Sequence, residues 1–457
     1  MAGPLQAEQR ALSPDANRYL VLADNLRRFQ VFGKAREDGY VHQALQRLRE
    51  EKGTLPPADE HGFRPEGFRT PGYPAFIAVT AAVFGDRRMT LVLQCLFGAL
   101  MGLLVSDLAR RSGLSGLAAT ATGFVWALHP GLAVYDGQYL TEGLFNTTII
   151  TGLWCVARLE SVGQPLGALL VGVAGLVRPL GPLFLPTAIV LGFRQARARI
   201  AWILVAAALV AAPSLLWATR NLRVGEGFRV STVGDFNLLF YTVPYSMAEA
   251  HGSDWNEEWR SNVDKIMITL DSELREGQDT FAAVRHLALQ EIISRPRATT
   301  RVQIKAFVKL LVDHSLPDLY QEWGRTYEPS GLFSRLVLRE QGGSQQARID
   351  RTGAAAVVAW MMLNGLIVLS AGTGLALAVW RRRWTFVATW GLPVILFSIA
   401  TGSVGLERFR MPVVLPLLML CGYALDAAVG RAQDVVAGRR SAQLEVTSPQ
   451  KTTALRN

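Results

Sequence analysis

The stretch Gly67-Phe68-Arg69-Thr70-Pro71-Gly72-Tyr73-Pro74 joins a polar, charged segment to the first apolar helix of the chain. Its prolines and glycine favour a turn followed by the start of a helix. Arginine in such a turn can hold a phosphate through paired N–H donors, or it can extend its charged end from an apolar surface into water. The stretch therefore marks a point of membrane entry, and the local sequence leaves both interpretations of Arg69 open.

The composition is that of a membrane protein. Of the 457 residues 50% are hydrophobic, and the mean hydropathy is +0.21, which is too apolar for a soluble chain of this length. The net charge of +10 fits basic cytoplasmic loops, and no zinc spacing or compact basic motif points to nucleic acid. The three cysteines lie in apolar runs and are typical of core positions.

Hydropathy divides the chain into five parts. Residues 1–70 are polar and carry amphipathic helices, and residues 71–218 and 353–429 contain the apolar runs. Residues 219–352 form a second polar region, for which we expect helices and strands, and residues 430–457 form a basic tail that we expect to be disordered. The sequence thus predicts an all-α polytopic membrane protein with a mixed α/β outer region and about nine spans. The expected spans are 88–107, 116–134, 139–158, 165–178, 179–193, 201–218, 353–379, 384–401 and 411–429.

Two helices are expected around the quoted stretch. The segment from Asp15 to Phe29 has an apolar face suited to a membrane surface or to packing on other helices. This face comprises Tyr19, Leu22, Ala23, Leu26 and Phe29. Residues 71–85 are apolar but too short for a span, which indicates a surface-lying or re-entrant helix.

Arginine clusters predict the orientation, because basic loops stay on the cytoplasmic side. If the spans alternate and residues 71–85 do not cross, one side receives Arg110, Arg111, Arg158, Arg194, Arg197, Arg199, Arg381, Arg382, Arg383, Arg431, Arg439 and Arg440. Residues 1–70 and 219–352 then share the outer side. To reach it, residues 1–70 need either unaided translocation or a preceding membrane helix, and a start codon assigned too late would remove such a helix.

Ionisable residues near the outer face are candidates for chemistry, because charge at membrane depth is costly. Asp15 follows a proline at the head of a helix, where it could cap the helix, act as a general base, or do both. Glu142 begins a span, where the helix dipole favours an acid. Arg178 interrupts a pair of apolar helices and requires an anion or a carboxylate partner.

Arg220, Arg408 and Arg410 also lie on the expected outer side, and the last two run against the usual charge bias. Arg220 closes the span at 201–218, and Arg408 and Arg410 open the last span. An anionic ligand at the outer membrane surface would explain their presence. Motifs of soluble hydrolases, phosphate-binding loops and paired CxxC sites are absent from the sequence.

Taken in order, these motifs resemble the GT-C superfamily of polyprenyl-phosphate-sugar-dependent glycosyltransferases, of the glycosyltransferase family 39 type. Protein O-mannosyltransferases and lipid A aminoarabinose transferases belong to it. The resemblance covers most of the chain except the tail. It rests on Pro14-Asp15 with Tyr19 and Ala23-Asp24-Asn25-Leu26, on Phe68-Arg69-Thr70-Pro71-Gly72-Tyr73-Pro74, on Tyr139-Leu140-Thr141-Glu142, on Leu176-Val177-Arg178-Pro179, on Ala218-Thr219-Arg220-Asn221 and on Glu407-Arg408-Phe409-Arg410-Met411-Pro412.

The resemblance implies a multi-pass enzyme of the cytoplasmic (inner) membrane whose active site faces the periplasm or cell exterior. It implies transfer of a hexosyl or pentosyl group, with inversion, from a polyprenyl-phosphate sugar to a hydroxyl of a lipid, glycan or protein. Asp15 matches the catalytic base, and Arg69 matches a basic position near the lipid phosphate. The other residues that the resemblance places at the donor or in the active site are Tyr73, Arg178, Arg408, Arg410, Glu142 and Arg220.

Two questions stay open at the level of sequence. Members of the superfamily differ in their use of a divalent metal, and the single acid of the first motif does not decide it. The alternative function is a non-catalytic lipid carrier, transporter or envelope-assembly protein on the same helices. A transporter predicts several charges near the middle of the bilayer and inverted repeats. Apart from Arg178 the spans are nearly free of charge, and polar residues cluster at the outer face, which favours chemistry there.

Overall fold

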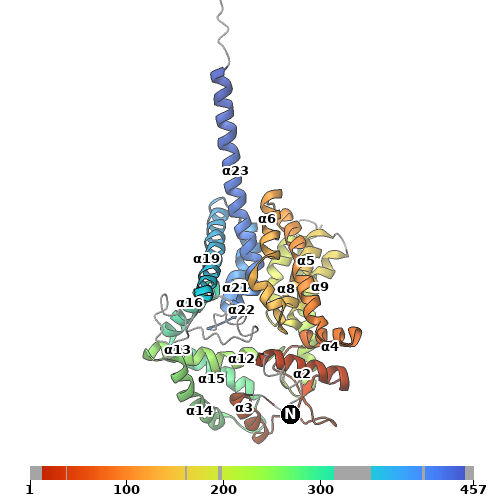
Figure 1. The fold of residues 1–457 in the computed structure, drawn as a ribbon. Helices are drawn as coiled ribbons and strands as arrows, with labels where there is room; N and C mark the ends of the chain where they lie inside the picture. The colour runs from red at the N-terminus through yellow and green to blue at the C-terminus, as the bar shows by residue number, and fades with distance from the viewer. Residues whose placement is uncertain are drawn as a thin grey trace, which may run out of the picture.

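The computed structural model is largely helical (Figure 1). It describes residues 13–35, 37, 39–159, 162–193, 198–312, 351–403 and 407–447. Within these ranges the strands are two short segments, β1 (Gly33–Lys34) and β2 (Arg64–Pro65), which pair antiparallel. Helix packing therefore organises the whole described fold.

The apolar helices form one bundle. They are α4 (Gly72–Phe84), α5 (Met89–Arg111), α6 (Gly116–Ala127), α7 (Pro130–Asp136), α8 (Thr141–Arg158), α9 (Gly163–Val177), η1 (Gly181–Phe184), α10 (Leu185–Gly192), α11 (Arg199–Arg223), α19 (Arg351–Trp380), α20 (Trp384–Phe386), η3 (Val387–Gly391), α21 (Leu392–Ala400), α22 (Glu407–Arg410), η4 (Met411–Val413) and α23 (Val414–Thr447). Their buried side chains, such as Phe145, Phe184 and Trp390, make one continuous core. Small residues allow close packing, since a Cβ on Gly152 would lie 2.8 Å from the carbonyl oxygen of Gly167.

Four helices of the described chain are long and apolar enough to cross a membrane: Met89–Arg111, Arg199–Arg223, Val358–Trp380 and Arg408–Arg431. A fifth span results if α6 and α7, which are bent by 43°, count as one. Shorter apolar helices, among them α4 and α9, do not reach this length. An all-α protein with membrane-spanning helices is thus confirmed, whereas the number of nine spans stays a prediction.

The polar helices lie together across one end of the bundle (Figure 1). They are α2 (Pro14–Phe29), α3 (Tyr40–Glu51), α12 (Val233–Asn237), η2 (Leu238–Thr242), α13 (Val243–His251), α14 (Trp255–Glu273), α15 (Thr280–Ser294) and α16 (Pro296–Val312). A second core joins α3 to the later helices, with Val41 and Leu45 in the same cluster as Phe240 and Leu270. We call this assembly the polar layer. Residues 219–312 contain no strand, so the mixed α/β composition expected of this region is not found in its described part.

Helix α2 lies in the polar layer next to α4 (Figure 1). Its predicted apolar face is buried or half-buried except at Phe29, which is 40% exposed. The cap of α2 is Ser13, whose hydroxyl oxygen accepts from the Ala16 N–H at 3.2 Å. The carboxylate of Asp15 therefore does not cap the helix and is available for other partners.

Helix α4 begins inside the quoted stretch and has 13 residues, too few to cross a bilayer of about 30 Å. It ends at Gly85, whose φ of 74° is the left-handed conformation that glycine supplies at helix ends. Because α4 contacts both α2 and α5, the quoted stretch lies at the junction of the polar layer and the apolar bundle.

Candidate functional site

Five charged side chains form a continuous series of ion pairs at this junction. Arg69 Nη2 lies 2.5 Å from Asp15 Oδ1, and Arg408 Nη1 lies 2.6 Å from Asp15 Oδ2. Glu142 Oε1 accepts from Arg408 Nε at 2.5 Å and from Arg178 Nη1 at 2.7 Å. We call this set the ionic cluster. Its members come from α2, the quoted stretch, α8, the end of α9 and α22.

The ionic cluster has a closed end and an open end. The side chains of Glu142 and Arg178 are 1% and 9% exposed, whereas that of Asp15 is 27% exposed. Three guanidinium groups face two carboxylates, so one positive charge remains uncompensated within the cluster. An excess cation in a partly desolvated site attracts an anion. The accessible side for such an anion is the end at Asp15.

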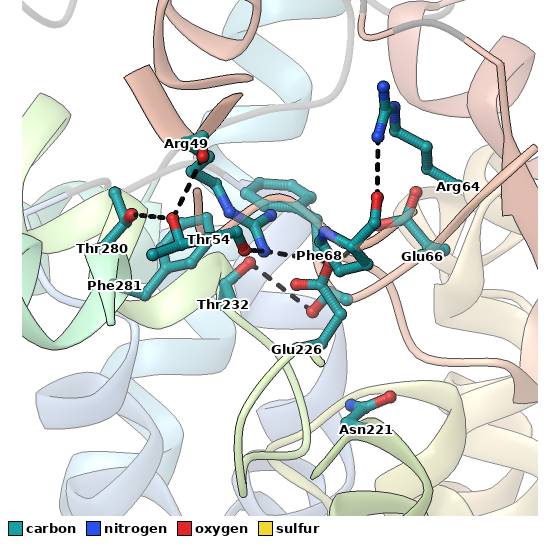
Figure 2. A network of polar contacts seen from close by, with 12 residues as sticks. Arg49, Thr54, Arg64, Glu66, Phe68, Asn221, Glu226, Thr232, Thr280 and Phe281 are labelled. Carbon is teal, nitrogen blue, oxygen red and sulfur yellow. Dashed lines mark hydrogen bonds and ion pairs between the residues drawn. The ribbon is translucent and has the colours of Figure 1, made fainter. Parts of the chain in front are cut away.

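The turn that presents Arg69 is held by Glu66, which is 2% exposed and is drawn with Phe68 in the polar network of Figure 2. Glu66 Oε1 accepts from the backbone N–H groups of Phe68 at 2.6 Å and of Arg69 at 2.9 Å. Glu66 Oε2 lies 2.9 Å from Lys34 Nζ, and Thr70 Oγ1 donates to the Val177 carbonyl at 3.0 Å. The backbone around Arg69 is thus fixed against both the polar layer and the bundle.

Aromatic rings orient the Arg69 side chain. Its guanidinium carbon lies 5.3 Å from the centroid of the Tyr19 ring and 4.9 Å from that of Phe68. Stacking on aromatic faces suits a guanidinium and leaves its edge available to an anion. Tyr73 supports Tyr19 in turn, with ring centroids 5.2 Å apart, and its hydroxyl donates to Gln94 Oε1 at 2.6 Å.

Arg178 and Glu142 meet because of the way their helices end and begin. Arg178 follows α9 in an extended conformation (φ −139°, ψ 132°), which the next residue, Pro179, favours. Glu142 lies in the first turn of α8, where the helix dipole stabilises a carboxylate. The carboxylate partner that the sequence required for Arg178 is therefore Glu142.

Two of the predicted residues contact other groups. Arg410 Nη1 donates to the carbonyl of Leu311 at 2.7 Å, because residues two apart on a helix do not face the same side. Arg220 donates to the carbonyl oxygens of Glu66 at 3.2 Å and Phe32 at 3.1 Å. Arg220 thus holds the turn that carries Arg69 and does not pair with Asp15 or Glu142.

Asp15 is ionised in this arrangement. Burial alone would raise the pKa of Asp15, but the positive charges of Arg69 and Arg408 outweigh burial and hold the pKa well below its usual range. A carboxylate with so low a pKa is a weak base. Asp15 can accept a proton efficiently only after these two arginines have found another anion.

His42 lies beside the ionic cluster and predicts an acid-sensitive fold. Burial and the charges of Arg18 and Lys34 lower its pKa to about 3. The unfolded side chain titrates near pH 6.5, so below that pH the unfolded chain binds a proton that the folded chain does not. The free energy of unfolding then falls by up to about 1.4 kcal/mol per pH unit as pH decreases from 6.5 to 3. We expect His42→Gln to flatten this dependence in thermal unfolding at pH 7 and pH 5.

The control for His42 is His286→Gln on the exposed side of α15. It should leave the pH dependence of unfolding as in the wild type. Identical pH dependence in the wild type and in His42→Gln would contradict the role of His42.

The sequence leaves the use of a divalent metal open, and the described geometry offers no candidate metal site. Within the described ranges, no three His, Cys, Asp or Glu side chains are grouped so that they could hold a metal ion. Both oxygens of Asp15 contact guanidinium groups, whereas a divalent cation prefers several oxygen ligands. The residues around Asp15 do not fit a divalent metal.

Five of the eight residues singled out from the sequence pair directly in the ionic cluster, and Tyr73, Arg220 and Arg410 do not. Sequence reasoning missed Glu66, and the signal available for it was an acid directly before the quoted stretch. Tyr19 was identified only as part of an apolar face. Comparison with known proteins finds no matching family model and no matching curated protein.

Proposed function

We propose that this protein is a multi-pass membrane glycosyltransferase that moves a sugar from a polyprenyl-phosphate donor to an acceptor hydroxyl. The position of Asp15 between Arg69 and Arg408 carries the proposal. Sugar transfer from such a donor needs a base for the hydroxyl and cations for the leaving phosphate. These three side chains supply both at one point, next to an apolar bundle that suits a prenyl chain.

The donor phosphate binds the guanidinium groups of Arg69 and Arg408. Asp15 occupies these groups in the free protein, so the phosphate displaces its carboxylate and the pKa of Asp15 rises. Asp15 then takes the proton of the acceptor hydroxyl while the hydroxyl oxygen attacks the anomeric carbon. The bond from this carbon to the phosphate oxygen breaks, its electron pair stays on the phosphate, and the two arginines hold the added charge. Attack opposite to the leaving phosphate inverts the anomeric carbon.

Glu142 and Arg178 act as positioning residues. Their pair is almost fully buried, and Glu142 also holds Arg408 Nε. An arginine side chain is flexible by itself, and a carboxylate fixed behind it reduces the entropy lost when a phosphate binds. The buried pair therefore keeps Arg408 directed at Asp15 before the donor arrives.

The proposal includes the finer topology. About nine spans in the cytoplasmic membrane would place the polar layer on the periplasmic or exterior side. In support, the Arg381–Arg383 run follows α19 at the end of the bundle opposite to the polar layer (Figure 1). Single introduced cysteines at Glu257 and Arg382, labelled with an impermeant maleimide, test this: the first should react from outside and the second only after permeabilisation.

Arg69→Ala should raise the KM for a polyprenyl-phosphate sugar by about ten- to a hundred-fold, because a charge-assisted contact with phosphate is lost. Arg69→Lys should recover part of the affinity, since it keeps the charge but not the paired donors. Transfer of radiolabelled sugar in membranes at increasing donor concentration measures both. The control is Arg27→Ala on the exposed end of α2, which should behave as wild type. An unchanged KM in Arg69→Ala would count against the phosphate contact.

A further inference from the structure

A cavity lies at the end of the bundle opposite to the polar layer and has no part in the proposed transfer. Its volume is about 600 Å³, within the range of about 300–1,000 Å³ that is usual for ligand sites. It is formed by the turn after α5, the end of α10, the turn between α19 and α20, and α23. We call it the basic cavity.

Three consecutive arginines, Arg381, Arg382 and Arg383, line the basic cavity. Each is exposed, and within the described part of the chain none of them lies within 4.0 Å of a carboxylate oxygen. Asp426, also in the lining, accepts from the Ser115 backbone N–H at 3.0 Å. The cavity thus presents several cations that have no internal counterion in the described structure.

The backbone at Arg382 is unusual for an arginine. Its φ is 55°, the left-handed conformation, at a helix end where glycine is the usual residue. The N–H groups of Arg382 and Arg383 close the end of α19 by donating to the carbonyls of Val379 at 2.9 Å and Ala378 at 2.8 Å. A side chain kept in a strained backbone position is a signal of function when other features of the site agree with it.

Aromatic rings form a large part of the remaining lining. Trp384, Phe386, Trp390 and Tyr423 line the cavity, and the rings of Phe386 and Tyr423 lie 4.8 Å apart. A phosphate ion has no apolar surface to bury against these rings, whereas the glycerol and first methylene groups of a lipid have such surface. The combination of paired N–H donors and apolar rings matches an amphiphilic anion.

We propose that the basic cavity binds the phosphate headgroup of an anionic membrane lipid. The arginines of the turn hold the phosphate, and the aromatic walls hold the glycerol. This site is separate from the ionic cluster, and its existence does not depend on the proposed glycosyltransferase activity.

The test uses the full chain purified in a zwitterionic detergent, with native mass spectrometry during titration by phosphatidylglycerol or phosphatidylcholine. Wild type should retain one phosphatidylglycerol with at least about a ten-fold preference over phosphatidylcholine. Arg382→Gly removes one charge and relaxes the helix end, so it should bind phosphatidylglycerol about ten-fold more weakly while its Tm is equal or higher. This variant separates loss of the site from loss of the fold.

The control is Arg110→Gln, which removes an exposed charge at the end of α5 outside the cavity lining. It should bind phosphatidylglycerol as wild type does. Equal weakening in Arg110→Gln and Arg382→Gly would show a general attraction of basic loops to anionic lipid and would overturn the site. Undiminished binding when all three arginines are replaced by Gln would do the same. Full displacement of the lipid by millimolar inorganic phosphate would assign the cavity to a free anion and overturn the lipid as its occupant.

Discussion

Asp15→Asn is expected to lower the rate of sugar transfer by about a hundred- to ten-thousand-fold, because the amide cannot take the proton of the acceptor hydroxyl. The fold should persist, since Ser13 caps α2 and Asp15 does not. The substitution also frees Arg69 and Arg408 from an internal anion. The donor should therefore bind more tightly while kcat falls, and a measurement of kcat and KM in membranes separates the two effects.

The matched control for this experiment lies on the same helix. Asp24 has a side-chain exposure of 41% and approaches Arg87 only to 4.0 Å, so Asp24→Asn should transfer sugar as wild type does. Equal rates for wild type and Asp15→Asn would remove Asp15 as the base. A rise in KM that accompanies the fall in kcat would instead point to a structural role for Asp15.

Glu142→Gln is expected to lower the free energy of unfolding by about 3–5 kcal/mol, because it leaves the buried guanidinium of Arg178 without its counterion, whereas Arg408 keeps Asp15. Glu142 is 1% exposed and contacts both Arg178 and Arg408. Water cannot solvate the guanidinium of Arg178, which is 9% exposed, as it would at a surface. Thermal unfolding of the purified protein in detergent measures the loss.

A double-mutant cycle tests whether the loss comes from this pair. Removal of the unpaired cation by Arg178→Met should recover part of the stability in the double variant, because residues in contact do not behave additively. Glu60→Gln, at a side chain that is 87% exposed, should leave unfolding unchanged. Strictly additive losses for Glu142→Gln and Arg178→Met would contradict a direct interaction.

The sequence was sufficient to single out the five charged residues of the ionic cluster as candidates but not to show which of them meet. Asp15, Glu142 and Arg178 were identified from the cost of charge near a membrane, which is a local argument. Arg408 reaches Asp15 across 393 positions of the chain, and such a pairing depends on the packing of the entire bundle. The positions of the charges along the chain identified the candidate residues, whereas the ion pairs between them are visible only in the tertiary structure.

The candidates that lie outside the ionic cluster show what a local argument lacks. Arg408 and Arg410 are both candidates at the start of the last span, but positions two apart on a helix face different sides, and Arg410 contacts the Leu311 carbonyl instead of the ionic cluster. Arg220 acts on the site only by donating to the backbone carbonyl of Glu66. No pattern in the sequence predicts this contact. The strands expected in residues 219–352 were inferred from β-prone runs, and in the described part of this region tertiary packing favours helices.

Under the proposed function, Asp15 competes with the donor phosphate for Arg69 and Arg408. Any anion that binds Arg69 and Arg408 must displace the carboxylate of Asp15. This carboxylate belongs to the same chain, so its local concentration is always high. Inorganic phosphate or a soluble sugar phosphate offers the two arginines only its charge, and it replaces one anion by another with little gain in free energy. A lipid-linked phosphate also brings a hydrocarbon chain, and each methylene that leaves water adds about 0.8 kcal/mol. Selectivity for a lipid-linked donor can thus arise from competition with Asp15, without a pocket that recognises the structure of the lipid.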